Sequence, residues 1–175
     1  GGTGVANEDG LVVLNVASTG QPVSFDPADA NLVVNEYTEY DCYDTLLDFN
    51  QDGTDVVPAL AESWEQVDDL TYTYKIREGV KFSDGSDLTM DDVLYSLNRV
   101  REDAYGMSYL FEHVDSYEVD EKTRTLTVHL TQPDSTWKYV PATTPCQILK
   151  KSVVETEGDA YGTNEGSVVG TGPYK

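Results

Sequence analysis

Strict alternation of apolar and polar side chains over residues 70–77 limits what this chain can fold into more than any other feature of its sequence. Successive side chains of a β-strand point to opposite faces, so the run is typical of a strand with one buried and one solvated face. Residues 62–67 precede it across two aspartates, Asp68 and Asp69, and the two runs form a predicted hairpin. The apolar positions of the alternating run are Leu70, Tyr72, Tyr74 and Ile76.

A second hairpin and a helix are predicted further along the chain. Residues 114–120 and 124–130 flank a polar turn, and the second run again alternates. Between the hairpins, Thr89 stands three residues before Asp92, the spacing of a capping box at a helix N-terminus. Strands and helices mix without a repeated strand–helix–strand order, which predicts an α+β fold, a mixed sheet with packed helices. The apolar stripe of the helix consists of Val93, Leu94, Leu97 and Val100.

Shorter signals predict the remaining elements. The β-branched run at 11–17 is typical of a buried strand. Apolar residues at three- and four-residue steps predict a helix over 32–47. The polar residues 48–53 favour a turn. Toward the C-terminus we expect a helical turn at 135–140, a strand at 146–149 and a brief helix at 152–157.

The charge of the chain excludes one large class of partner. Its 175 residues include 11 Lys and Arg against 32 Asp and Glu, a net charge of −21. Nucleic acid is excluded as a partner because phosphate binding needs a basic footprint. The longest apolar runs fall far below the ~20 residues that a membrane-spanning helix requires. An aromatic content of 10% argues against a disordered acidic chain.

One polar loop resembles a calcium loop without completing it. Asp48, Asn50, Asp52 and Gly53 stand at positions 1, 3, 5 and 6 of an EF-hand loop. Position 12, where that loop carries a bidentate glutamate, is Ala59. We therefore expect a polar turn and no metal site, and keep a calcium-dependent interaction module as an alternative function.

The sequence lacks the signatures of an enzyme. It has no Gly-x-Ser-x-Gly string, and His113 and His129 are separated, each in or beside a predicted strand. We expect no catalysis and no cofactor, with a hydrolase of peptides or glycans as a further alternative. Two cysteines and two separated histidines match no zinc spacing. Cys42 and Cys146 either form a disulfide, as in an extracytoplasmic protein, or remain buried thiols, as in a cytosolic one.

Six phrases in a fixed order closely resemble the family 5 extracellular solute-binding proteins of ABC importers, a family that includes oligopeptide-, dipeptide- and nickel-binding proteins. The resemblance runs from about Asp9 to Lys175. The phrases are FDP at 25–27, YDTLL at 43–47, PALAESWE at 58–65, YTYKIREGVKFSDG at 72–85, LTMDDVLYSL at 88–97 and VGTGPY at 169–174.

The resemblance implies a fold larger than this chain. Members of the family have two lobes that close on a ligand, the type II, cluster C form of the periplasmic-binding-protein fold, and the chain resembles their N-terminal part. The implied organisation is a flexible tether at 1–9, the first strand and loop of lobe one at 10–31, an inserted α+β subdomain at 32–168 and re-entry into lobe one at 169–175.

The resemblance also implies a function and a site. The whole protein would capture peptides or a similar small solute outside the membrane and deliver them to ABC permease subunits. It would be periplasmic or a cell-surface lipoprotein, anchored by a lipid on a cysteine before this sequence. In peptide-binding relatives the main chain after the Asp-Pro phrase pairs with the extended ligand as an added strand would. By position those residues are Ala30, Asn31, Leu32 and Val33, with Asn31 facing the cleft; alternatively they only lead into the next helix.

Overall fold

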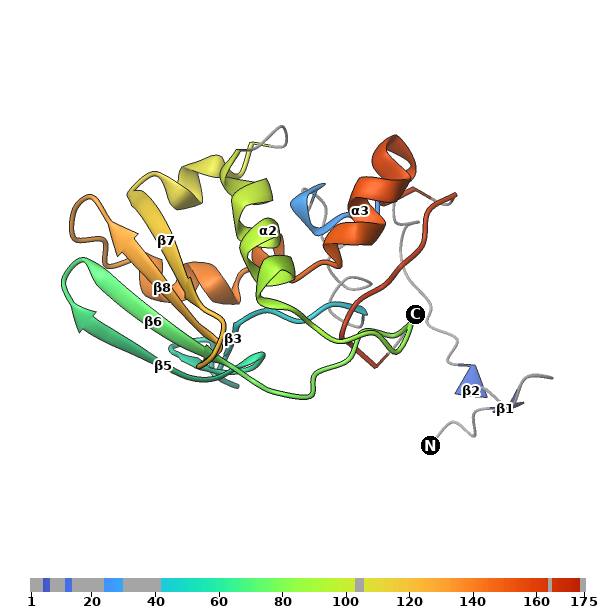
Figure 1. Cartoon of the computed structure of the whole chain (residues 1–175), viewed down its shortest axis with the longest axis horizontal. Helices are drawn as coiled ribbons and strands as arrows, with labels where there is room; N and C mark the ends of the chain where they lie inside the picture. The colour runs from blue at the N-terminus through green and yellow to red at the C-terminus, as the bar shows by residue number, and fades with distance from the viewer. Residues whose placement is uncertain are drawn as a thin grey trace.

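A four-stranded antiparallel sheet forms one end of the described part of the chain, to the left of helix α2 in Figure 1. The computed structural model describes residues 5–6, 12–13, 24–29, 42–102, 106–163 and 165–173. Both predicted hairpins are confirmed, and they join edge to edge through antiparallel pairing of their inner strands. The strand order is β5-β6-β8-β7, with β5 at Ala61–Asp68, β6 at Thr71–Ile76, β7 at Val114–Asp120 and β8 at Thr125–Leu130.

The alternation in the sequence sets which face of the sheet is buried. Tyr72 pairs with Val128 and Tyr74 with Leu126, so their apolar side chains share one face, and all four are 2% exposed or less. Leu70 departs from the prediction: it is 38% exposed because it belongs to the turn that precedes β6. The sheet therefore has one dry face, which the helical elements cover.

Helix α2, Met90–Arg101, packs on the dry face through Val93, Leu97 and Val100. The predicted capping box is confirmed, because the Asp92 amide donates to Thr89 Oγ1 at 3.1 Å and the Thr89 amide donates to Asp92 Oδ2 at 3.0 Å. These two bonds satisfy backbone donors that the first helical turn leaves without partners.

Short 3₁₀ segments complete the cover of the core. Segment η3, Trp137–Ala142, confirms the predicted helical turn, and its Trp137 indole donates to the Tyr74 hydroxyl at 3.1 Å. Segment η2, Ser108–Phe111, places Phe111 edge-on to Trp137 with ring centroids 5.5 Å apart. Both rings belong to the same buried cluster as the sheet and α2.

The predicted helix over 32–47 is wrong at its C-terminal end, while its residues 32–41 lie outside the described ranges. Strand β3, Leu47–Phe49, pairs with β4, Val56–Pro58. The Leu46 carbonyl accepts hydrogen bonds from the amides of Ala59 and Ala61. A short apolar run does not by itself distinguish helix from strand, and here pairing with distant backbone decides the outcome. The predicted turn is confirmed at its centre, where the Gly53 amide donates to the Asn50 carbonyl.

A second correction concerns the strand predicted at 146–149. Segment η4, Thr144–Cys146, is a 3₁₀ turn, and the residues after it are extended but join no sheet. They are buried instead by packing, with one backbone bond from the Ile148 amide to the Asp44 carbonyl at 2.8 Å. The predicted helix that follows is confirmed as α3, Lys151–Glu157, which leads into η5, Gly158–Ala160.

The N-terminal region has three described elements. Strand β1, Val5–Ala6, pairs with β2, Val12–Val13, which lies within the strand predicted at 11–17. The rest of that predicted strand and the start of the predicted tether lie outside the described residues. Segment η1, Pro27–Asp29, packs against η4. None of the described helices has the length and apolar character needed to cross a membrane.

Candidate ligand-binding site

The predicted ligand segment, Ala30 to Val33, lies outside the described residues, whereas the chain on both sides of it is described. The upstream flank is residues 24–29, and the downstream flank begins at Cys42. Contacts with the rest of the described chain hold these two flanks in place.

An ion pair anchors the upstream flank. Asp26 receives hydrogen bonds from both terminal nitrogens of Arg99 on α2, at 2.7 Å for Oδ1 and 2.5 Å for Oδ2. The side chains are only 5% exposed for Asp26 and 17% for Arg99. A bidentate pair of this kind fixes direction as well as distance, because two parallel bonds allow one orientation.

Further contacts hold the backbone around Asp26. Its Oδ1 accepts the Ala28 amide at 3.0 Å, and its own amide donates to Ser24 Oγ at 3.1 Å. The Phe25 amide donates to the Gly162 carbonyl at 2.8 Å. Residues 24–28 are thus bound to two separate parts of the chain, α2 and the turn after η5.

A pair of tyrosines joins the two flanks. The Arg99 guanidinium lies 5.7 Å from the centre of the Tyr161 ring, and the Tyr161 hydroxyl is 3.2 Å from the Tyr43 hydroxyl. Burial raises the pKa of Tyr161 strongly, and the neighbouring Tyr43 adds to that rise. Tyr161 therefore stays neutral, and the two hydroxyls form a hydrogen-bonded link between α2 and the downstream flank.

The downstream flank is held by the C-terminal segment of the chain. The Gly172 amide donates to the Cys42 carbonyl at 3.0 Å, and Thr171 Oγ1 donates to Asp44 Oδ2 at 2.7 Å. A β-carbon on Gly170 would stand 1.9 Å from the Cys42 carbonyl oxygen, so only glycine permits this approach. Residues 170–172 and 42–44 therefore lie side by side.

Gln147 is a buried amide that sequence reasoning missed. It follows η4 directly, is 1% exposed, and neither its Oε1 nor its Nε2 has a hydrogen-bond partner in the structure. Buried amides without partners are rare because burial removes their hydrogen bonds to water. The sequence carries a faint signal for it, a lone glutamine inside the apolar run from Pro145 to Leu149.

The two cysteines, for which a disulfide was one alternative, are both buried thiols in the structure. Cys146 belongs to the main core, whereas Cys42 belongs to a second cluster with Tyr43, Leu149 and Tyr161. Thr143 Oγ1 donates to the Cys146 sulfur at 3.6 Å. The two side chains therefore pack in different apolar clusters.

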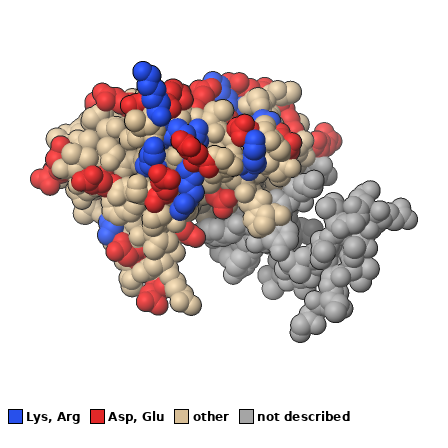
Figure 2. Space-filling model, turned by 60° about the horizontal axis from the view of Figure 1, so that its bottom comes forward, with Lys and Arg blue, Asp and Glu red and all other residues tan. Residues whose placement is uncertain are grey.

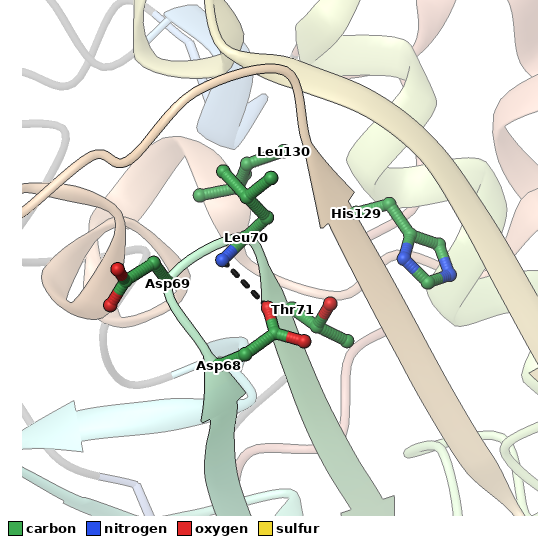
Figure 3. Close-up of a pocket in the computed structure, with 6 residues that line it drawn as sticks. All are labelled: Asp68, Asp69, Leu70, Thr71, His129 and Leu130. Atoms are coloured by element: carbon green, nitrogen blue, oxygen red, sulfur yellow. Dashed lines mark hydrogen bonds between the residues drawn. The ribbon is translucent and has the colours of Figure 1, made fainter.

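The histidines lie apart from the flanks of the ligand segment. His129 borders a hollow of about 460 Å³ at the tip of the β5–β6 hairpin (Figure 3). Its imidazole and the Asp69 carboxylate stand on opposite sides of Leu70 there, and Asp68 Oδ1 accepts the Leu70 amide at 2.8 Å. His113 Nδ1 is 3.1 Å from Asp134 Oδ2. Among the described residues no serine, threonine or cysteine side chain stands beside either imidazole within hydrogen-bonding distance.

The side chains of the calcium-like loop serve the β3–β4 turn. Asn50 Oδ1 accepts the amides of Thr54 and Asp55, at 2.9 and 3.2 Å, and Asp48 Oδ1 accepts the Phe49 amide. These oxygens are therefore used within the turn. Within the described ranges no group of three or more His, Cys, Asp or Glu side chains could hold a metal ion.

Basic side chains on the surface are balanced by acidic neighbours. On the face shown in Figure 2, Lys and Arg side chains lie beside Asp and Glu side chains. Lys138 pairs with Asp55 at 2.6 Å, and Lys150 pairs with Asp84. Hydrogen bonds from Lys150 and Ser86 hold the pKa of Asp84 well below its usual range. The arrangement offers anionic ligands little basic surface.

Comparison with known proteins relates the chain to one family. Residues 55–175 match the model of the bacterial extracellular solute-binding proteins, family 5 middle region. The glutathione-binding protein GsiB of Escherichia coli O1:K1 is 31% identical over 155 residues, 87% of this chain and 29% of GsiB. The transcriptional regulator SgrR of E. coli K12 is 30% identical over 132 residues, 75% of this chain and 22% of SgrR. The chain therefore spans less than a third of the length of these curated relatives.

Solved structures show the same fold. Listeria monocytogenes OppA bound to peptide superposes with a TM-score of 0.79 at 26% identity, covering 89% of this chain and 34% of OppA. Haemophilus influenzae OppA in complex with RPPGFSPFR gives a TM-score of 0.75 at 29% identity, covering 88% and 33%. The α+β class and its place in a larger periplasmic-binding-protein fold are confirmed. The chain belongs to the family 5 bacterial extracellular solute-binding proteins.

Proposed function

We propose that this chain is part of the substrate-binding component of an ABC importer, which captures peptides or a similar small solute outside the membrane. The observation that carries the proposal is the family match over 55–175 together with the fold shared with OppA bound to peptide. The relative GsiB is named for binding glutathione, which is a small peptide. GsiB and the two OppA structures are binding proteins by name, which agrees with a receptor that does no catalysis.

The mechanism we infer is enclosure between two lobes. The ligand would bridge this part of the protein and a second lobe, and the closed form would be presented to permease subunits. On this side, the main chain of Ala30–Val33 would pair with an extended peptide, and the Asn31 side chain would face the cleft. Such pairing recognises the shape of a peptide without demanding one sequence.

The proposed organisation treats residues 32–168 as an inserted subdomain between 10–31 and 169–175 of lobe one. The neighbouring positions of 42–44 and 170–172 support this division, because an insertion enters and leaves its parent lobe at adjacent points. Secretion to the periplasm, or attachment to the cell surface by a lipid, completes the proposal.

Calorimetry with the intact protein tests the function. We expect at least one member of a defined tripeptide panel, such as tri-alanine or tri-lysine, to bind the intact protein with a dissociation constant near micromolar. Residues 1–175 alone should bind feebly, because half of the contacts are missing. No binding by the intact protein to any tripeptide would contradict the peptide assignment. Micromolar binding by residues 1–175 alone would contradict enclosure by two lobes.

A second candidate is the ligand-sensing part of a transcriptional regulator, which the similarity to SgrR favours. The reading frame upstream of Gly1 distinguishes the two. A helix–turn–helix segment there supports a regulator, whereas a secretion signal, with or without a cysteine for lipid attachment, supports the importer component.

A further inference from the structure

We propose that the buried Asp26–Arg99 pair is a positioning device, which fixes the chain just before the ligand segment against helix α2. The inference deepens the proposed function and rests on it for the role of Ala30–Val33. Its structural part, that the pair holds residues 24–28 in place, stands on contacts within the described chain.

The geometry of the pair is what a positioning role requires. Arg99 approaches Asp26 through both terminal nitrogens, at 2.7 and 2.5 Å, and its guanidinium is held from another side by the Tyr161 ring. The carboxylate in turn holds the Ala28 amide, two residues before the ligand segment. Helix α2 thereby controls the last part of the chain before Ala30.

Stability alone does not account for the pair. Two charges buried together lose hydration, and replacing both by apolar groups is often neutral or even stabilising, so a buried pair contributes little net stability. The ring that Arg99 contacts, Tyr161, belongs to the smaller apolar cluster and not to the larger one that joins the sheet to α2. Because the larger core does not include this ring, the pair can fail while the sheet and α2 stay packed.

We call residues 24–28, which are bound by both α2 and the turn after η5, the crossing. Gly162 provides a second contact with it. A β-carbon on Gly162 would stand 2.6 Å from Asp26 Cβ and 3.0 Å from its amide nitrogen. The φ of Gly162 is +78°, a conformation that other residues rarely adopt. Glycine is therefore needed where residues 24–28 pack against the turn after η5, and an alanine there would displace the crossing without touching the ion pair.

Hydrogen exchange of residues 1–175 tests the structural part. In the double variant Asp26→Asn with Arg99→Met, which leaves no charge at this buried site, we expect the amides of positions 25, 26 and 28 to exchange at least about tenfold faster while those of β6 and β8 keep their protection. Gly162→Ala should reproduce this local pattern. Gly158→Ala is the matched control: its φ is also positive, at +51°, but no atom lies within 4 Å of an added β-carbon.

Two exchange results would overturn the proposal. Unchanged exchange at 25–28 would mean that the pair does not hold the crossing, and faster exchange throughout the chain would mean that it serves the global fold. Arg99→Lys keeps the charge but loses the two-pronged contact. We therefore expect this variant to restore only part of the protection.

Tripeptide binding by the intact protein tests the ligand part. Tri-alanine, or the tightest binder of the tripeptide panel, should bind at least about tenfold more weakly to the double variant and to Gly162→Ala. It should bind equally well to the control Asp91→Asn, which changes the same helix as Arg99 but breaks only an exposed pair with Lys151 of α3. Unchanged affinity with a loosened crossing would overturn the positioning role. Failure of the unaltered protein to bind any tripeptide would refute the proposed peptide function, and the exchange data would then decide the structural part alone.

Discussion

Gln147 shows how far one side chain can depart from the rules that govern the rest of the core. Its amide is buried without a partner, which costs free energy relative to an apolar side chain of similar shape. We therefore expect Gln147→Met to leave the free energy of unfolding unchanged or to raise it by about 1 kcal/mol. Urea denaturation of both chains measures the difference, with the exposed Gln66→Met as the control. A loss of stability in Gln147→Met alone would show that the amide has a bound partner, such as an internal water.

Cys146 is a second residue whose chemistry is set by burial. The thiol is fully buried, and the loss of hydration raises its pKa to about 12. Because only the thiolate reacts, we expect iodoacetamide at pH 8 to leave Cys146 unlabelled in the native chain and to label it in urea, read by mass spectrometry. Labelling of the native chain would contradict this, and resistance to labelling in urea without reductant would reveal a disulfide.

The same shift gives stability a pH dependence. The folded pKa of Cys146 lies above the value of about 8.5 expected in the unfolded chain. This contribution to stability is therefore complete below pH 8.5 and is lost as the pH rises toward 12. Urea midpoints should fall more steeply between pH 8 and pH 10 for the unaltered chain than for Cys146→Ala.

Among the elements, helix α2 depends on its capping box. Thr89 Oγ1 accepts the Asp92 amide and donates to Asp92 Oδ2 at 2.7 Å. Thr89→Ala removes both bonds, and we expect the free energy of unfolding to fall by about 1 kcal/mol. Thr156→Ala is the control, because Thr156 lies exposed in the last turn of α3, where its hydroxyl donates to the Ser152 carbonyl instead of capping a helix start and alanine is the better helix former. Equal effects at the two positions would contradict a capping role.

The sequence predicted an element correctly where the residues that determine it are close together in the chain. The alternation in β6 and β8 and the Thr89–Asp92 spacing are local signals, and the predictions built on them are confirmed. Residues 43–47 and 146–149 were misassigned because short apolar runs suit a helix, a strand or a packed coil, and contacts made elsewhere in the chain decide among them. The Asp26–Arg99 pair joins residues 73 positions apart, so no local pattern announces it. The ligand segment itself stays a prediction.

At the scale of the whole molecule, charge is far from balanced. With 32 acidic and 11 basic residues, at least 32 − 11 = 21 carboxylates have no basic partner even if every cation is paired. Uncompensated charges of one sign repel each other and destabilise the compact state. Exposed ion pairs such as Lys81–Asp87 contribute little in return, so screening them removes little stability.

Salt should therefore stabilise this chain. Between 0.01 and 0.1 M NaCl the screening length falls from about 30 to about 10 Å, which weakens long-range repulsion more than the short contacts within ion pairs. We expect the melting temperature to rise over this range, by about 2–4 °C for each kcal/mol of repulsion removed. Circular dichroism melts at fixed pH measure the rise, and at pH 4.1, where the net charge is close to zero, the dependence on salt should be much smaller. A melting temperature that falls with added salt at pH 7 would mean that attractive ion pairs outweigh the repulsion.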